Sequence, residues 1–161
     1  MFFLNRKIKL KEIFYNFGLR KISFSNLVKH TLILFFLIFI ISISLSTIFT
    51  FVGLDDLHLV SSTILSIPLL YIFYLFVIRV FLEEWFFRGF LVNRIGVYLS
   101  SLLFAIGHIS YGSIVEVIGA FILGVVLGKY YLKTKNLWVN YLAHFLYNFS
   151  AFLLMTLAQT L

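Results

Sequence analysis

The chain has 161 residues, of which 62% are hydrophobic, 20% are aromatic and 12% are charged, and its mean hydropathy is +1.07. A soluble globular domain is about one-quarter charged, so this composition excludes the soluble enzyme classes and predicts an integral membrane protein. The sequence contains no cysteine. Disulfides, thiolate nucleophiles and cysteine metal ligands are therefore excluded as well.

The net charge of +7 comes from basic residues that lie beside apolar segments. Seven of the thirteen precede the first long apolar run, and three more are Lys129, Lys133 and Lys135. Basic residues beside membrane spans set the orientation of the chain and bind anionic headgroups. We therefore expect membrane lipids, and not nucleic acid, to be the partners of these charges.

Residues 1–30 form a basic segment in which apolar side chains recur at helical spacing. These side chains are Leu10, Ile13, Phe14 and Phe17. The pattern predicts an amphipathic helix that lies on the cytoplasmic leaflet, with a solvated basic tail as the alternative. The interspersed charges and the short apolar core do not fit a cleavable signal peptide.

Residues 31–161 predict one transmembrane domain, an all-α bundle of about five helices. The expected spans are residues 31–53, about 70–93 with an earlier start near Thr63, 97–109 or a little beyond, about 114–131, and about 137–161. An apolar helix of about 20 residues is long enough to cross a bilayer. The only proline, Pro68, lacks an amide hydrogen and predicts a kink or a late start in the second span.

Acidic residues lie at the opposite ends of these spans from the basic clusters. Asp55 and Asp56 follow the first span, and Glu116 follows the third. The basic clusters fall in residues 1–29, 88–94 and 129–135. Under the positive-inside rule this pattern places the N terminus in the cytoplasm and the C terminus outside. The sequence thus predicts a multi-pass protein of the cell membrane.

The stretch Glu83-Glu84-Trp85-Phe86-Phe87-Arg88-Gly89 places three ionisable side chains in an apolar region. Such groups are costly at membrane depth and usually mark a functional site. Glu84 and Arg88 are one helical turn apart and are expected to pair, whereas Glu83 points about 100° away and stays free for another helix. A helix continuous through this stretch places Glu83 near mid-membrane. A helix that ends at Leu82 places it at the inner headgroups.

Two other spans carry polar side chains at four-residue spacing. Phe104 and His108 share one face of the third span, and Asn140, His144 and Asn148 share one face of the fifth. We assign Asn140 to helix packing and expect the others to converge on the free carboxylate. A carboxylate in an apolar pocket can act as a general base, and a histidine beside it can hold the attacking water. A second histidine with an asparagine can stabilise an oxyanion, so the set suits hydrolysis.

These motifs occur in an order that resembles one known family. The matching segments are Glu83-Glu84 with Arg88 for EExxxR, Phe104 to His108 for FxxxH, Phe121 to Gly128 for a glycine-bearing motif, and His144 to Asn148 for HxxxN. Together they resemble the CPBP family of intramembrane proteases, which includes CAAX proteases and the bacteriocin-processing and Abi proteins. The resemblance covers about residues 80–150.

The resemblance implies a role for each motif residue. Glu83 would be the general base, helped by His108, and His144 with Asn148 would form the oxyanion site. The supporting residues would be Glu84, Arg88 and Phe104. No cofactor is required by this mechanism. The alternative is a zinc ion held by Glu83, His108 and His144, although the HExxH spacing of soluble zinc proteases is absent.

The expected substrate is a peptide or a membrane-protein segment near the cytoplasmic half of the bilayer. The short chain favours bacteriocin processing or self-immunity over cleavage of a prenylated CAAX tail. One alternative is a bacteriocin immunity or scaffold protein without protease activity. A proton or ion carrier is a weaker alternative, because a single set of five helices has no internal repeat for alternating access.

Overall fold

The computed structural model describes residues 12 and 15–160, and every regular element within these residues is helical. This confirms the all-α class predicted from the composition. The predicted amphipathic helix rests mainly on Leu10, Ile13 and Phe14, which lie outside the described residues.

The first span, α2 (Phe24–Phe51), begins earlier than predicted because a side chain caps it. The hydroxyl oxygen of Ser23 accepts a hydrogen bond from the amide of Asn26 at 3.4 Å, which satisfies one of the helix's first unpaired donors. The helix has 28 residues and buries a narrow stripe that includes Leu34 and Ile38. Many of its other large apolar side chains are exposed, as expected of a helix surrounded by lipid.

A sharp bend follows at the proline. The short helix α3 (Leu57–Leu65) and the helix that begins with α4 (Leu69–Tyr74) meet at 115°. Pro68 lies just before α4, where its missing amide costs nothing. The prediction of a kink or late start at Pro68 is therefore confirmed.

The second span continues from α4 without interruption. It runs through η1 (Leu75–Arg79), α5 (Val80–Glu83), η2 (Glu84–Leu91) and the start of α6 (Val92–Ile106). Both η1 and η2 are π-helical, a wider winding that is frequent at functional sites. The helix therefore does not end at Leu82 and is continuous through the glutamate segment, whereas the depth of Glu83 in the membrane stays a prediction. Gly96, at φ 80°, then breaks α6 and reverses the chain.

The last two helices follow a short turn. That turn holds η3 (Ile109–Tyr111) and leads into α7 (Ile114–Thr134) and α8 (Leu137–Thr160). Gly112 takes φ +74° in the turn, a conformation that favours glycine. The hydroxyl oxygen of Ser113 then caps α7 by accepting a hydrogen bond from the amide of Glu116 at 3.0 Å.

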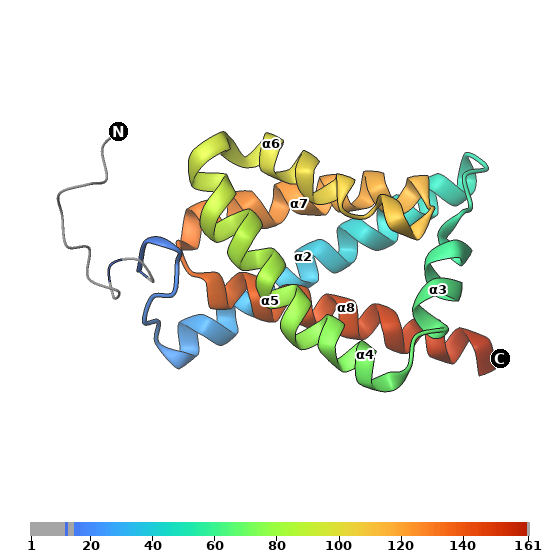
Figure 1. Cartoon of the computed structure of the whole chain (residues 1–161), viewed down its shortest axis with the longest axis horizontal. Helices are drawn as coiled ribbons and strands as arrows, with labels where there is room; N and C mark the ends of the chain where they lie inside the picture. Colours follow the sequence, from blue (N-terminus) through green and yellow to red (C-terminus); the bar gives the residue numbers. More distant parts are fainter. Residues whose placement is uncertain (1–11, 13–14, 161) are drawn as a thin grey trace.

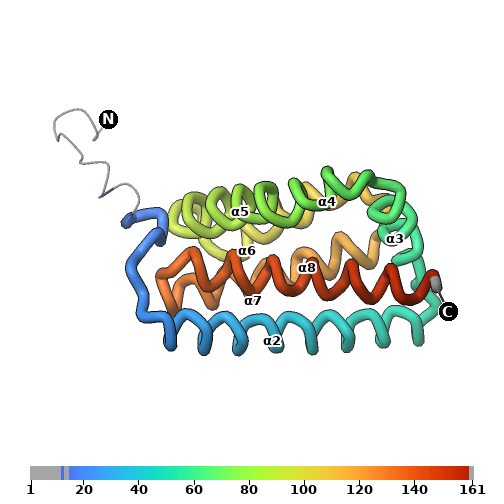
Figure 2. The backbone as a smooth tube through the Cα atoms, turned by 90° about the horizontal axis from the view of Figure 1, so that it is seen from below, coloured from blue at the N-terminus to red at the C-terminus, as the bar shows by residue number. Residues whose placement is uncertain are grey.

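Successive passes of the chain run antiparallel along one bundle (Figures 1 and 2). Helix α2 packs against α7 and α8, and α7 packs closely against α6. The largest core cluster joins α2, α7 and α8 and consists of Leu34, Ile38, Leu123, Leu127, Tyr130, Val139 and Ala143. The five-helix bundle expected from the apolar segments is therefore present.

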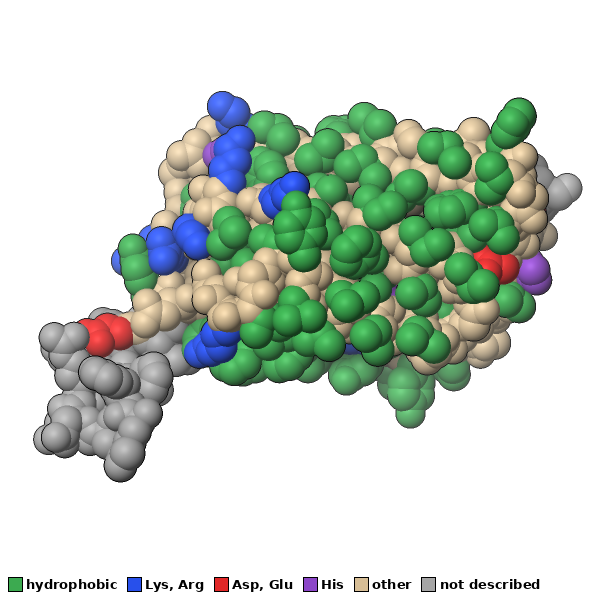
Figure 3. All heavy atoms as spheres, turned by 90° about the horizontal axis from the view of Figure 1, so that it is seen from above, with side chains coloured by type: hydrophobic (Ala, Val, Ile, Leu, Met, Phe, Trp, Pro, Cys, Tyr) green, Lys and Arg blue, Asp and Glu red, His purple; other side chains and the backbone are tan. Residues whose placement is uncertain are grey.

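The passes differ in length. Within the described residues, α2, α7 and α8 are long and apolar enough to cross a membrane, and the bent α3–α4 pair would make a fourth span. The pass after Gly96 is shorter. Figure 3 shows Lys and Arg side chains gathered at one end of the bundle, with acidic side chains and a histidine at the other. The molecule therefore has the charge asymmetry of a membrane protein with a fixed orientation.

Candidate active site

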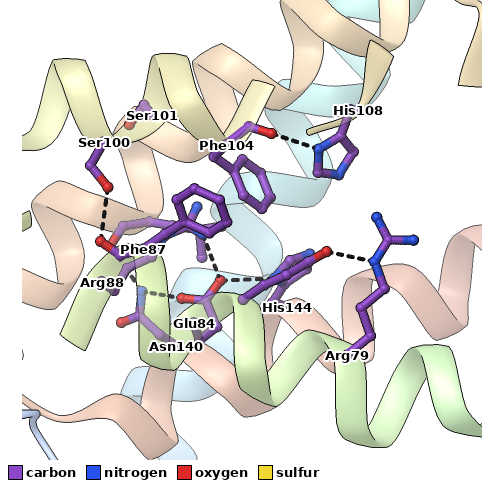
Figure 4. Close-up of polar contacts among 12 residues, drawn as sticks. Arg79, Glu84, Phe87, Arg88, Ser100, Ser101, Phe104, His108, Asn140 and His144 are labelled. Carbon is purple, nitrogen blue, oxygen red and sulfur yellow. Dashed lines mark hydrogen bonds and ion pairs between the residues drawn. The ribbon is translucent and has the colours of Figure 1, made fainter. Parts of the chain in front are cut away.

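A fully buried carboxylate, Glu84 on η2, joins two helices at the centre of the bundle (Figure 4). Its Oε1 lies 3.1 Å from Nη1 of Arg88 and 2.8 Å from Nδ1 of His144. Its Oε2 accepts a hydrogen bond from the side-chain amide of Asn140 at 3.3 Å. The predicted pair of Glu84 and Arg88 is confirmed, and α8 contributes two further partners.

The guanidinium group of Arg88 is also buried, with 1% of the residue exposed. The ring of Phe104 lies beneath it, 4.2 Å from ring centroid to guanidinium carbon, so a cation–π contact adds to the ion pair. Two opposite charges in close contact reduce the cost of burying each one. Phe104 was predicted to support the site, and its ring lies in contact with the Arg88 guanidinium group.

Asn140 has a larger part in this cluster than a packing residue would have. It is fully buried and its side-chain NH2 also donates to the backbone carbonyl of Leu127 on α7, at 2.9 Å. The amide therefore ties α7 and α8 to the carboxylate of Glu84. The four-residue spacing of Asn140, His144 and Asn148 was the sequence signal that pointed to this face.

Glu83 lies in a different environment from its neighbour. Its Oε1 accepts a hydrogen bond from Nε of Arg79 at 2.8 Å, and Nη1 of Arg79 donates to the Tyr111 hydroxyl at 3.1 Å. The prediction that Glu83 stays free of an ion pair is therefore wrong. Arg79 is one turn earlier on the same continuous helix, where side chains four apart are neighbours. The pair is partly open, with side-chain exposures of 33% for Arg79 and 15% for Glu83.

Each of the two predicted site histidines, His108 and His144, has one ring nitrogen that contacts a hydrogen-bond acceptor. Nδ1 of His108 lies 2.8 Å from the backbone carbonyl of Phe104, and Nδ1 of His144 contacts the carboxylate of Glu84. Carbonyl and carboxylate oxygens only accept hydrogen bonds, so each Nδ1 carries a hydrogen. In the neutral histidine, Nε2 is then an acceptor that can receive a hydrogen bond from water.

Two cavities meet at one wall of the site. The first has a volume of about 70 Å³ and reaches His144, and the second has a volume of about 110 Å³ and reaches Glu83. The shared wall consists of His108, Glu116, Tyr147 and Asn148. The four residues predicted to be catalytic thus line two adjacent cavities that share a wall, and each cavity has room for several water molecules.

Two members of that wall were missed by the sequence analysis. Glu116 was assigned to an outer turn, but it lies in the first turn of α7. Its spacing from the buried Ala120, Leu123 and Leu127 could have placed it on the inner face of the helix. Tyr147, whose hydroxyl hydrogen-bonds Ser42 of α2 at 2.7 Å, is three residues from a predicted site histidine.

The side chains do not fit a metal centre. Within residues 12 and 15–160, no three His, Cys, Asp or Glu side chains lie close enough together to hold a metal ion. The alternative of zinc held by Glu83, His108 and His144 is therefore not supported by the positions of these side chains in this structure.

Comparison with known protein families gives one match. Residues 65–150, just over half of the chain, match the family model described as Type II CAAX prenyl endopeptidase Rce1-like. The matched segment extends from the end of α3 into α8 and contains the four residues predicted to be catalytic. No curated protein and no solved structure matches the chain.

Proposed function

Because the chain belongs to the Rce1-like family of type II CAAX prenyl endopeptidases, which are membrane proteases, we propose that it hydrolyses peptide bonds within the membrane with water activated by Glu83 and His108. The proposal rests on the observation that Glu83 and His108 line the same cavity, which has room for several water molecules. The proposed substrate is a peptide or a membrane-protein segment that enters near the cytoplasmic half of the bilayer. Bacteriocin processing or self-immunity is the biological setting that we favour.

The different surroundings of the two glutamates support Glu83 as the base. Glu84 is fully buried, and both of its oxygens have partners. Glu83 lines the second cavity, and its Oε2 makes no hydrogen bond within the described part of the chain. A general base must reach the proton that it removes, which Glu83 can do and Glu84 cannot.

Proton transfer then follows from the fixed positions of these groups. A water in the cavity donates one hydrogen bond to Oε2 of Glu83 and one to Nε2 of His108. As the water oxygen bonds to the peptide carbonyl carbon, Glu83 takes the proton, and it returns this proton to the nitrogen when the C–N bond breaks. Arg79 holds Glu83 through its other oxygen and so keeps the carboxylate directed at the cavity.

The oxyanion formed by this attack would lie against α8. His144 and Asn148 are one helical turn apart and both line the first cavity. Nε2 of His144 donates a hydrogen bond to the oxyanion in the protonated ring, whose Nδ1 stays hydrogen-bonded to the carboxylate of Glu84. The amide of Asn148 supplies a second donor. Donors placed in advance at the developing charge supply a large share of catalysis.

Cleavage assays in proteoliposomes test this proposal. We would compare a prenylated CAAX peptide, its unprenylated form and an apolar membrane peptide, with products identified by mass spectrometry. Glu83→Gln and His108→Ala are expected to lower the cleavage rate by at least about 100-fold at unchanged protein levels. Asp55→Asn, a control outside the cavities, should cleave normally. Wild-type rates in Glu83→Gln would disprove Glu83 as the base.

The same variants separate protease function from immunity without proteolysis. A scaffold or immunity protein would still protect cells from a bacteriocin after Glu83→Gln, because binding does not need the base.

Metal dependence is tested on the same purified protein. Cleavage by wild-type protein should survive a chelator, and stoichiometric zinc together with loss of activity in chelator would overturn the metal-free mechanism.

A further inference from the structure

A carboxylate with no part in the mechanism above lies between the two cavities. Glu116 is half-buried in the first turn of α7 and belongs to the lining of both spaces. Its backbone amide donates a hydrogen bond to the capping Ser113 hydroxyl. Within the described residues, the side chain of Glu116 makes no hydrogen bond and no ion pair.

The other charges around the cavities are already balanced. Arg79 pairs with Glu83, and Arg88 pairs with Glu84. His144, which donates to the oxyanion when protonated, lies against Glu84 and not against Glu116. The carboxylate of Glu116 is therefore a negative charge without an ion-pair partner within the described residues. Within an apolar bundle such a charge attracts a cation more strongly than it would in water.

We propose that Glu116 binds an ammonium group inside the cavities. An ammonium group occurs on a lysine side chain of a peptide and at the amino terminus that peptide hydrolysis releases. Which of the two is the natural ligand rests on the proposed function. Tyr147 and Asn148, on the same wall, offer a hydroxyl and an amide oxygen as further acceptors. The cavities are large enough for an ammonium group.

Three small peptides measure this binding without requiring catalysis. Leucyl-leucine amide carries a free amino terminus, acetyl-leucyl-leucine amide carries no ammonium group, and acetyl-lysyl-leucine amide carries one on its side chain. Each is titrated into purified protein in detergent, and the unfolding temperature is recorded. We expect saturable stabilisation by at least one ammonium peptide and none by the neutral one. Equal effects of all three would overturn the proposal.

The pattern among the peptides identifies the source of the ammonium group. Stabilisation by leucyl-leucine amide alone assigns Glu116 to the released amino terminus, and stabilisation by the lysyl peptide alone assigns it to a substrate side chain. Glu116→Gln should weaken ammonium binding by at least about tenfold, because a charge-assisted bond is lost. Asp55→Asn removes a nearby surface charge outside the cavities and should bind normally. Unchanged affinity in Glu116→Gln would overturn the proposal.

A second measurement uses the wild-type protein, in case Glu116→Gln does not fold. Dicyclohexylcarbodiimide modifies carboxyl groups in apolar surroundings, and the ammonium peptide should protect Glu116 from it, as read by peptide mass spectrometry. Labelling that the peptide does not change contradicts the inference. Ammonium binding by a protein that cleaves no peptide would instead contradict the proposed function alone, and cleavage without ammonium binding would contradict this inference alone.

Discussion

Glu83 and Glu84 are neighbours in the sequence, but the helix directs them about 100° apart, into different surroundings. Glu84 faces the bundle interior and is held by groups from two helices. Glu83 faces the second cavity and, among the residues that the structure describes, forms an ion pair with Arg79 of its own helix alone. One residue therefore contributes mainly to structure, and the other is available for chemistry.

This difference predicts losses of stability of different size for two substitutions. Glu84→Ala should lower the free energy of unfolding by about 3–5 kcal/mol, because it leaves Arg88 buried without its carboxylate. Glu83→Ala should lower it by no more than about 1 kcal/mol, because the pair with Arg79 is partly open. Unfolding in detergent, followed by circular dichroism, measures both. Similar losses in the two variants would show that Glu84 has no special structural role.

At the scale of single helices, α7 owes its close approach to α6 to two glycines four residues apart. A Cβ at Gly128 would lie 2.9 Å from Cγ1 of Val97, and one at Gly124 would lie 3.1 Å from Cβ of Ser101. Both distances are shorter than ordinary van der Waals contact. Small residues at this four-residue spacing are typical of helices that pack closely in membranes.

A matched pair of substitutions on α7 tests this packing. Gly128→Ala should destabilise the protein by about 1–3 kcal/mol, because Val97 follows the backbone break at Gly96 and has little room to move. Gly119→Ala meets no atom within 4 Å and should raise stability by up to about 1 kcal/mol through helix propensity. Thermal unfolding of the two variants measures both changes in stability. A stabilising Gly128→Ala would mean that α6 and α7 can separate without cost.

A clamp joins the loop after α2 to the start of α7. The carboxylate of Asp56 accepts hydrogen bonds from the Ser113 hydroxyl at 2.6 Å and from the amides of Ile114 at 2.6 Å and Val115 at 3.3 Å. The Ser113 hydroxyl, followed by the amides, holds the pKa of Asp56 below its usual value of 3.8. The clamp therefore fixes the helix on which Glu116 lies.

This clamp makes stability depend on pH in a defined direction. Because the pKa of Asp56 is lowered in the folded state, its contribution is complete above pH 3.8 and is lost as the pH falls through the folded-state pKa. Wild-type protein should lose more thermal stability between pH 6 and pH 3 than Asp56→Asn does. Asp55→Asn, whose side chain makes none of these hydrogen bonds, is the control. Identical pH profiles for wild type and Asp56→Asn would exclude the clamp.

For the whole molecule, the antiparallel passes bring like charges to the same end. The basic clusters gather where α2 begins, where the chain turns at Gly96 and where α7 ends, and Asp55 and Asp56 lie at the opposite end. We propose that the basic end faces the cytoplasm of a cell, in accordance with the positive-inside rule. The N terminus would then be cytoplasmic and the C terminus external.

Because the chain has no cysteine, single cysteines report this orientation directly. Asp55→Cys and Lys133→Cys are exposed positions at opposite ends of the bundle. A membrane-impermeant maleimide added to intact cells should label Asp55→Cys, and it should label Lys133→Cys only after the membrane is opened. The reverse labelling pattern would invert the proposed topology.

Much of the fold was determined by the sequence alone, because a membrane permits few arrangements of an apolar chain. Backbone groups in lipid must be hydrogen-bonded within helices. Long apolar segments therefore predicted the passes, and basic residues marked the end that the passes share. Helical spacing was also sufficient to predict that Glu84 pairs with Arg88 and that His144 and Asn148 share one face of their helix. These features depend on local geometry, which repeats along any helix.

Only the tertiary structure decided which polar groups meet across helices. The inclusion of Asn140 in the buried cluster and the position of Glu116 between the cavities depend on the break at Gly96 and on the rotation of each helix. Helix rotation is set by side-chain packing summed over the bundle. No single segment contains that information, so it becomes readable only when all the helices are assembled.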